Sequence, residues 1–198
     1  MRKLILGLLI PVFTHAQKLE GVWELKWGTS VDSAITIIKE SKGYTPQLKK
    51  TDTTVTLIFM NSKWGFETST FTRLEFYKDK LYSAIAFFTP DTPDEYFKLY
   101  TALKNSITEK YFTPQMDKEE FSQPFTKDDP NNKKMYAILK GYAHVGCSWD
   151  FSLASKFENN GVIALTITND SGIILWYRDG NISNIVSKQV DEKAKKDF

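Results

Sequence analysis

Side chains suited to acid–base or nucleophilic chemistry are scarce in this chain of 198 residues. It holds two histidines, His15 and His144, and one cysteine, Cys147. Histidine is the commonest general base near neutral pH, and a cysteine thiolate is a strong nucleophile. His144 and Cys147 lie three positions apart in an alternating segment, however, and residues at that spacing on a strand point to opposite faces. We therefore interpret Cys147 as a small buried hydrophobe, with a reactive thiol as the alternative.

Longer catalytic and metal-binding motifs are absent from the sequence. It contains no G-x-S-x-G, H-E-x-x-H, Walker A or G-x-G-x-x-G pattern. The acid-rich stretches Asp91–Glu95 and Lys127–Asn132 lack the spacing of a calcium loop, and we interpret them as a helix cap and a solvated turn. The sequence predicts no metal and no cofactor. Two glycosidase carboxylates contributed by distant strands remain an open alternative.

The first residues follow the order of a secretory signal peptide. Arg2 and Lys3 precede the apolar run Leu4–Phe13, and Thr14–Ala16 places small residues at the −3 and −1 positions of a cleavage site. This order predicts a signal peptide over residues 1–16 and a secreted or periplasmic location. No cysteine follows the apolar run, so a lipid anchor is not expected.

Composition limits the remaining function classes. Residues 17–198 are long enough for a single domain with a substantial core, and five Trp, nine Tyr and fourteen Phe can fill it. No later run reaches the roughly 18 apolar residues of a transmembrane helix. The formal net charge of the whole chain is +2. Removal of Arg2 and Lys3 with the predicted signal peptide would leave a protein that is close to neutral. Nucleic-acid binding needs a basic surface, so a nucleic-acid partner is not expected.

Hydrophobic periodicity predicts alternating groups of strands and helices. A helix is expected to begin at Thr29 or Ser30 and to stop at Gly43, and a second helix is expected over Asp94–Tyr111. Residues 116–134 are predicted to form a polar loop, and residues 181–198 a helical or frayed tail. The predicted strands are Leu19–Trp27, Thr53–Met60, two runs within Thr68–Phe88 joined at Lys78–Lys80, Met135–Tyr142, His144–Phe151, Val162–Asn169 and Ile173–Arg178.

This order of elements predicts an α+β fold. We expect a twisted antiparallel sheet of about six to eight strands with two main helices packed on one face, plus a C-terminal helix. The order of a helix followed by a meander occurs twice, over Thr29–Phe88 and over Asp94–Arg178. The two segments share this order of elements without a residue-level repeat.

Several segments resemble small secreted or envelope-associated bacterial proteins of unknown function. They are the helix start at Trp27–Ser30, the meander "FYKDKLYSAIAFF", the helix end "LKNSITEKY" and the strand "IILWYRD". The resemblance covers most of residues 17–198. It implies an α+β fold and an exported location, and it supplies no catalytic residues. Many such proteins carry a lipobox cysteine, which this chain lacks.

Strand alternation predicts one half-polar sheet face in the last third of the chain. Its members are His144, Ser148, Asp150, Thr166, Thr168, Trp176 and Arg178. A face with an exposed Trp and Arg has the makeup of a binding surface, and an ordinary solvated face or one covered by the tail helix is the alternative. The sequence thus favours an exported, non-enzymatic binding protein that contacts an envelope protein, peptide or glycan. The alternative function is a hydrolase of an extracellular polymer whose carboxylates the sequence does not single out.

Overall fold

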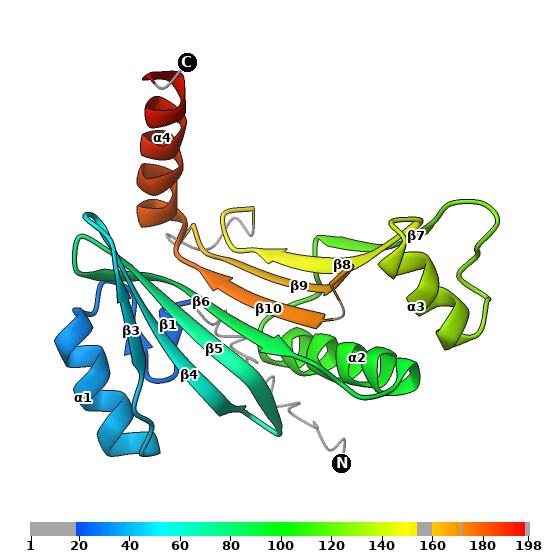
Figure 1. The fold of residues 1–198 in the computed structure, drawn as a ribbon, viewed down its shortest axis with the longest axis horizontal. Helices are drawn as coiled ribbons and strands as arrows, with labels where there is room; N and C mark the ends of the chain where they lie inside the picture. Colours follow the sequence, from blue (N-terminus) through cyan, green and yellow to red (C-terminus); the bar gives the residue numbers. More distant parts are fainter. Residues whose placement is uncertain (1–18, 154–159, 171, 197–198) are drawn as a thin grey trace, which may run out of the picture.

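An antiparallel sheet of eight strands organises the computed structural model, which describes residues 19–153, 160–170 and 172–196 (Figure 1). The predicted signal peptide, residues 1–16, lies outside the described residues. The helices are α1 (Val31–Lys42), α2 (Pro93–Lys110), α3 (Asn131–Leu139) and α4 (Gly180–Lys196). The strands are β1 (Gly21–Val22), β2 (Leu25–Lys26), β3 (Gln47–Lys50), β4 (Thr54–Trp64), β5 (Glu67–Tyr77), β6 (Lys80–Phe88), β7 (Met116–Phe121), β8 (Ala143–Asp150), β9 (Val162–Thr168) and β10 (Gly172–Arg178).

The sheet consists of two meanders that meet at its centre. The strand order is β3-β4-β5-β6-β10-β9-β8-β7, and β1 and β2 form a separate two-stranded sheet. Helix α1 precedes the meander β3 to β6, and α2 precedes β7 to β10, with α3 inserted between β7 and β8. The last strands of the two meanders, β6 and β10, pair antiparallel. The twofold order of helix and meander predicted from the sequence is confirmed.

The hydrophobic core collects alternate residues of the central strands. Ile163, Leu165 and Ile167 of β9 are buried, and Leu165 lies in register with Leu175 on one side and Cys147 on the other. Residues paired across antiparallel strands share a face, so these side chains form one apolar layer. The buried side chains of α1 and α2 belong to the same cluster as this layer. The antiparallel α+β fold predicted from the alternation is thus confirmed.

Both main helices begin and end where their caps predict. Ser30 caps α1 by accepting a hydrogen bond from the Ser33 backbone N–H, and Gly43 ends the helix with a φ of 69°. Thr92 caps α2 in a full capping box with Glu95. The carboxylate of Glu95 is therefore occupied by backbone donors, as the helix-cap interpretation of Asp91–Glu95 predicts.

The prediction of one strand over Leu19–Trp27 is wrong. The segment is a small hairpin in which Trp23 and Glu24 form the turn, with φ values of 53° and 67°. A two-residue turn of this kind needs positive φ at both central positions and usually contains Asn or Gly. Trp and Glu do not signal such a turn, so the apolar alternation hides it. The hairpin also needs Gly21, because a Cβ there would lie 1.7 Å from the Leu25 carbonyl oxygen.

The predictions for residues 116–142 are also wrong in part. The expected polar loop at 116–134 contains β7 and the start of α3, and the expected strand Met135–Tyr142 is mostly α3. Strand β7 is an edge strand whose four central side chains are charged and exposed, so its backbone pairing with β8 leaves no apolar alternation. In α3 the buried residues Met135 and Ile138 are one helical turn apart, within an apolar run too short to identify by periodicity.

The C-terminal tail is helical as far as Lys196. Figure 1 shows α4 leaving the end of β10 and extending away from the sheet. Its first turn is held by the buried Ser183 and Asp179, where the Ser183 backbone N–H donates to the Asp179 carbonyl. Within the described part of the chain, no helix combines the length and apolarity needed to cross a membrane.

Candidate functional site

The polar residues predicted to share a sheet face do lie on one face. The register aligns two rows across β8, β9 and β10, one of Ser148, Ala164 and Trp176 and one of Asp150, Val162 and Arg178. His144, Thr166 and Thr168 lie an even number of positions from these residues along their strands, so they share the face. Asp150 and Arg178 also line a shallow pocket of about 390 Å³ beside the start of α4.

Most of these side chains already have partners within the chain. The Trp176 Nε1–H donates to Ser83 Oγ at 2.9 Å, and the Arg178 guanidinium lies 5.3 Å from the centre of the Trp176 ring. Arg178 also donates to Ser187 Oγ of α4 at 3.2 Å. The face is therefore tied to its own strands and to α4, and a binding role for it stays a prediction.

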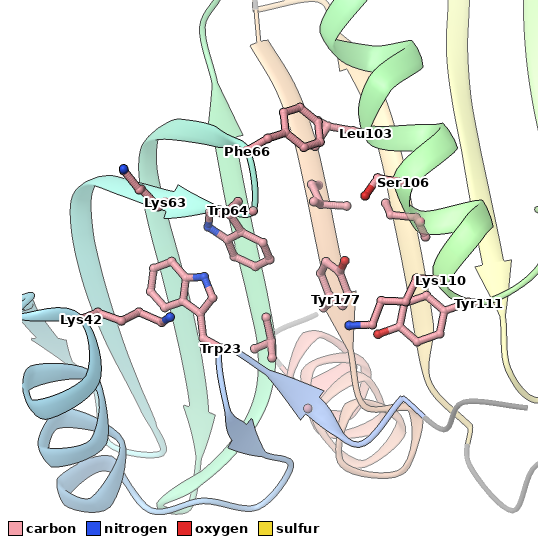
Figure 2. Close-up of a pocket in the computed structure, with 15 residues that line it drawn as sticks. Trp23, Lys42, Lys63, Trp64, Phe66, Leu103, Ser106, Lys110, Tyr111 and Tyr177 are labelled. Carbon is pink, nitrogen blue, oxygen red and sulfur yellow. The ribbon is translucent and has the colours of Figure 1, made fainter. Parts of the chain in front are cut away.

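A cavity of about 280 Å³ lies on the opposite side of the sheet, at the junction of the two meanders (Figure 2). The β1–β2 hairpin, the turn between β4 and β5, the C-terminal half of α2 and β10 all contribute to its wall. Leu175 and Tyr177 of β10 face it from the core side of the sheet, whereas Trp176 between them points away. Segments far apart in the sequence thus converge on one concave site.

The aromatic rings of Trp23, Trp64 and Tyr177 form the floor of this cavity, and Tyr44 packs against Trp23 outside it. We call Tyr44, Trp23, Trp64 and Tyr177 the aromatic ladder. Successive ring centres lie 6.0 Å, 5.3 Å and 5.6 Å apart. The last contact joins β4 of the first meander to β10 of the second. Burial raises the pKa of the Tyr177 hydroxyl, so this phenol stays neutral and the ladder adds no negative charge.

A cluster of buried hydroxyls fixes Trp64 within the ladder. The Trp64 Nε1–H donates to Thr72 Oγ1 at 2.6 Å, and Ser62 Oγ donates to the same oxygen at 2.7 Å. Ser69 Oγ lies 3.0 Å from Thr72 Oγ1, and all three hydroxyl side chains are fully buried. Polar groups that are buried and mutually satisfied lock side-chain geometry, so Trp64 is held in place before any ligand arrives.

The indole of Trp23 differs from that of Trp64. Its Nε1 atom is buried and has no hydrogen-bond partner among the described residues. Figure 2 shows this nitrogen on the side of the ring nearest Trp64. Buried N–H groups are paired in the great majority of proteins, so an unpaired donor at a cavity wall is a position for a ligand acceptor.

Three lysines line the cavity, and two of them bring their amines to its aromatic rings. Lys42 Nζ lies 5.9 Å from the centre of the Trp23 ring, and Lys110 Nζ lies 5.1 Å from that of Tyr111. Lys63 is exposed near the end of β4; its backbone N–H donates to the Tyr44 hydroxyl at 3.0 Å, and its side chain points away from the rings (Figure 2). None of the described residues that line this cavity is acidic.

A second cavity, of about 480 Å³, adjoins the first along the β1–β2 hairpin. It shares Trp23, Lys110 and Tyr111 with the first cavity and adds Glu20, Glu24 and Lys26. Acids and lysines are equal in number there, so the excess of positive charge lies in the first cavity, on the side of the hairpin that faces β4 and α2.

No protein-family model, curated protein or solved structure matches this chain. Support for a function therefore comes from the geometry of the cavity. Sequence reasoning did not predict this site, because its members come from elements that lie far apart in the sequence. The adjacent Lys110 and Tyr111 at the end of a predicted helix were the nearest signal.

Carboxylates gather at a third cavity, of about 570 Å³, beside the start of α2. Glu67, Asp91 and Glu95 line it. Glu95 caps α2, and Glu67 Oε1 accepts from the Thr68 backbone N–H at 2.9 Å. Two of the three carboxylates, those of Glu67 and Glu95, thus already accept hydrogen bonds from the backbone. The hydrolase alternative stays a prediction.

The only cysteine lies on the core face of β8, and His144 lies on the other face, so the chain places them apart. Burial raises the pKa of the Cys147 thiol, which is 2% exposed and lies beside the Tyr100 hydroxyl. The interpretation of Cys147 as a buried residue is confirmed.

Cys147 is consequently expected to react slowly with thiol reagents in the folded protein. Both burial and a raised pKa lower the accessible thiolate, so reaction with Ellman's reagent should be about a hundredfold slower than in concentrated guanidinium chloride. Release of thionitrobenzoate, followed by absorbance, measures both rates. Equal rates in the two solvents would mean that Cys147 is accessible in the native state.

Proposed function

We propose that this protein is an exported, non-enzymatic binding protein whose ligand occupies the cavity at the junction of the two meanders. The observation that carries this proposal is the aromatic ladder, in which Trp23, Trp64 and Tyr177 from three separate elements line one concave surface. Ligand sites are usually concave, lined by apolar and aromatic side chains, and equipped with a few polar groups. The unpaired Trp23 donor and the lysine amines supply those polar groups here.

Preorganisation of the wall further supports a binding role. Trp64 is held by the Thr72 hydroxyl, and the end of α2 is held by the Trp149 Nε1–H, which donates to the Phe112 carbonyl at 2.7 Å. A wall that is fixed in the free protein loses little conformational entropy on binding. We further infer that α1 and α2 pack on one face of the sheet, with the cavity between them.

Export is part of the proposal because of the first residues of the chain. The sequence order of Arg2, Lys3 and the apolar run predicts a secretory signal peptide. The ligand would then come from the envelope or from outside the cell. A fragment of an envelope glycan or peptide, or a small molecule taken up by the cell, meets that condition.

Recovery of a co-purified ligand tests the proposed site. The protein is incubated with an envelope extract, washed and denatured, and the released small molecules are identified by mass spectrometry. We expect the wild-type protein to retain a compound that Trp23→Leu loses, because this substitution removes both the ring and its N–H donor. Circular dichroism of Trp23→Leu establishes that the variant is folded.

Trp176→Leu is the matched control on the opposite face of the sheet. It should retain the compound, because the Trp176 ring points away from the cavity. Loss of the compound in Trp176→Leu with retention in Trp23→Leu would place the site on the polar sheet face instead. A protein that retains nothing contradicts the proposed binding function.

A further inference from the structure

We infer that the ligand of this cavity is a small organic acid, with a planar ring on the aromatic ladder and a carboxylate at the lysines. This inference rests on the proposed function, since it names the ligand class of the same site. Three separate features point to it: the sign of the charge around the cavity, the buried unpaired donor and the size of the cavity.

Charge is the first feature. Lys42, Lys63 and Lys110 line the cavity, and none of its described lining residues is acidic. Lys42 has one distant partner, Glu24 Oε1 at 3.9 Å, and within the described residues Lys63 and Lys110 make no ion pair. Like charges gathered around one low-dielectric wall raise the local concentration of an anion. Lys110, whose amine points toward the cavity in Figure 2, is therefore the group free to pair with a carboxylate.

The same charges exclude the main competing ligand class. Aromatic side chains grouped around a pocket often bind quaternary ammonium groups through cation–π interactions. Here the cations already belong to the protein, with Lys42 over Trp23 and Lys110 over Tyr111. A second cation would be repelled by all three amines. The aromatic ladder is therefore available to stack against a planar ring of the ligand.

The unpaired Trp23 donor is the second feature. Its buried Nε1–H lacks an acceptor among the described residues and lies at the wall beside Trp64. A carboxylate accepts such a hydrogen bond strongly, because charge-assisted hydrogen bonds are about twice as strong as neutral ones. The Trp23 donor and the Lys110 amine therefore both favour an anionic acceptor on the ligand.

Size and position are the third feature. A volume of about 280 Å³ is near the lower end of ordinary ligand pockets, which suits one or two fused rings rather than a polymer chain. In the adjoining cavity the carboxylates of Glu20 and Glu24 balance the amines of Lys26 and Lys110. The ligand carboxylate is therefore expected in the first cavity, on the side of the hairpin that faces β4 and α2.

Three naphthalene probes of one shape test the inference by isothermal titration calorimetry. They are naphthalene-2-carboxylate, its neutral carboxamide and a naphthyl trimethylammonium cation. We expect the carboxylate to bind about tenfold more tightly than the carboxamide and the cation not to bind measurably. Raising the salt concentration should weaken binding of the carboxylate and leave that of the carboxamide unchanged.

Variants assign the charge contribution to particular residues. Lys110→Gln should weaken carboxylate binding about fivefold and leave carboxamide binding unchanged. Lys98→Gln is the matched control, because Lys98 is an exposed lysine of the same helix that lines the third cavity instead. Its affinity for the carboxylate should equal that of the wild-type protein.

The possible failures are distinguishable. Equal affinity for carboxylate and carboxamide, or binding of none of the three probes, overturns the organic-acid inference and leaves the proposed site to the co-purification experiment. Carboxylate binding that persists unchanged in Trp23→Leu shows that the probe binds elsewhere, and this overturns the inference, while the proposed site is decided by the co-purification experiment.

Discussion

Trp149→Ala is expected to lower the free energy of unfolding by about 3–5 kcal/mol, the range for removing a large, fully buried aromatic side chain. Trp149 has no exposed surface and lies in register with Ile163 at the centre of the core layer. Its Nε1–H also satisfies the Phe112 carbonyl just beyond α2. The substitution creates a cavity and removes this hydrogen bond, and urea denaturation followed by circular dichroism measures the loss.

Two further variants separate these contributions. Trp149→Phe keeps a ring and removes the donor, so it should cost about 1–3 kcal/mol. Trp176→Ala removes a partly exposed Trp of the neighbouring face and should cost about 1–2 kcal/mol. If Trp149→Ala is no more destabilising than Trp176→Ala, then Trp149 does not occupy the core position described above.

The effect of Trp149 should extend to the cavity. The rings of Tyr111 and Phe112 both contact Phe151 edge-on, at 5.2 Å and 4.9 Å, so the end of α2 is fixed by the same aromatic cluster that contains the Trp149 hydrogen bond. Lys110 immediately precedes these residues. The core of the second meander thereby positions a lysine at the cavity.

Alternation and capping made the architecture largely predictable. The run Val162–Asn169 places its large apolar residues Ile163, Leu165 and Ile167 at every second position, and β9 occupies it almost completely. Ser30 and Gly43 mark the ends of α1 because a side-chain acceptor and a left-handed residue are needed at those two places. Each of these signals lies within the segment that it describes, so the element can be predicted without knowing what it contacts.

Elements whose signal is not local were mispredicted. Strand β7 forms because its backbone pairs with β8. Its exposed, mostly charged side chains are typical of an edge strand, but they contain no apolar alternation from which a strand could be predicted. The turn at Trp23 and Glu24 depends on close approach of the backbone at Gly21. Neither pairing partners nor backbone contacts can be inferred from the residues of one segment.

The candidate site shows the same division. The seven residues of the polar sheet face were predictable, because the period of two along a strand assigns them to one side. The aromatic ladder required knowledge of which strands meet, since Trp64 and Tyr177 lie more than a hundred positions apart and touch only because β6 and β10 pair at the centre. The cavity forms where the two meanders meet. The order of the meanders can be predicted from the sequence, but the pairing of β6 with β10 that brings them together cannot.

Thr72→Val is expected to lower the free energy of unfolding by about 2–3 kcal/mol, although it hardly changes the volume of the side chain. It removes the oxygen that accepts from the Trp64 indole and from Ser62, and unsatisfied buried donors cost about 1–3 kcal/mol each.

Thr72→Ser is the matched control, because it keeps the hydroxyl and removes only a methyl group, for a loss of about 1 kcal/mol. Near-ultraviolet circular dichroism should change in Thr72→Val and remain native in Thr72→Ser, since only the first frees the Trp64 ring. If the two variants have equal stability and equal spectra, the hydroxyl cluster does not position Trp64. If instead Thr72→Val also weakens binding of naphthalene-2-carboxylate, a residue that does not itself line the cavity determines the geometry of its aromatic floor.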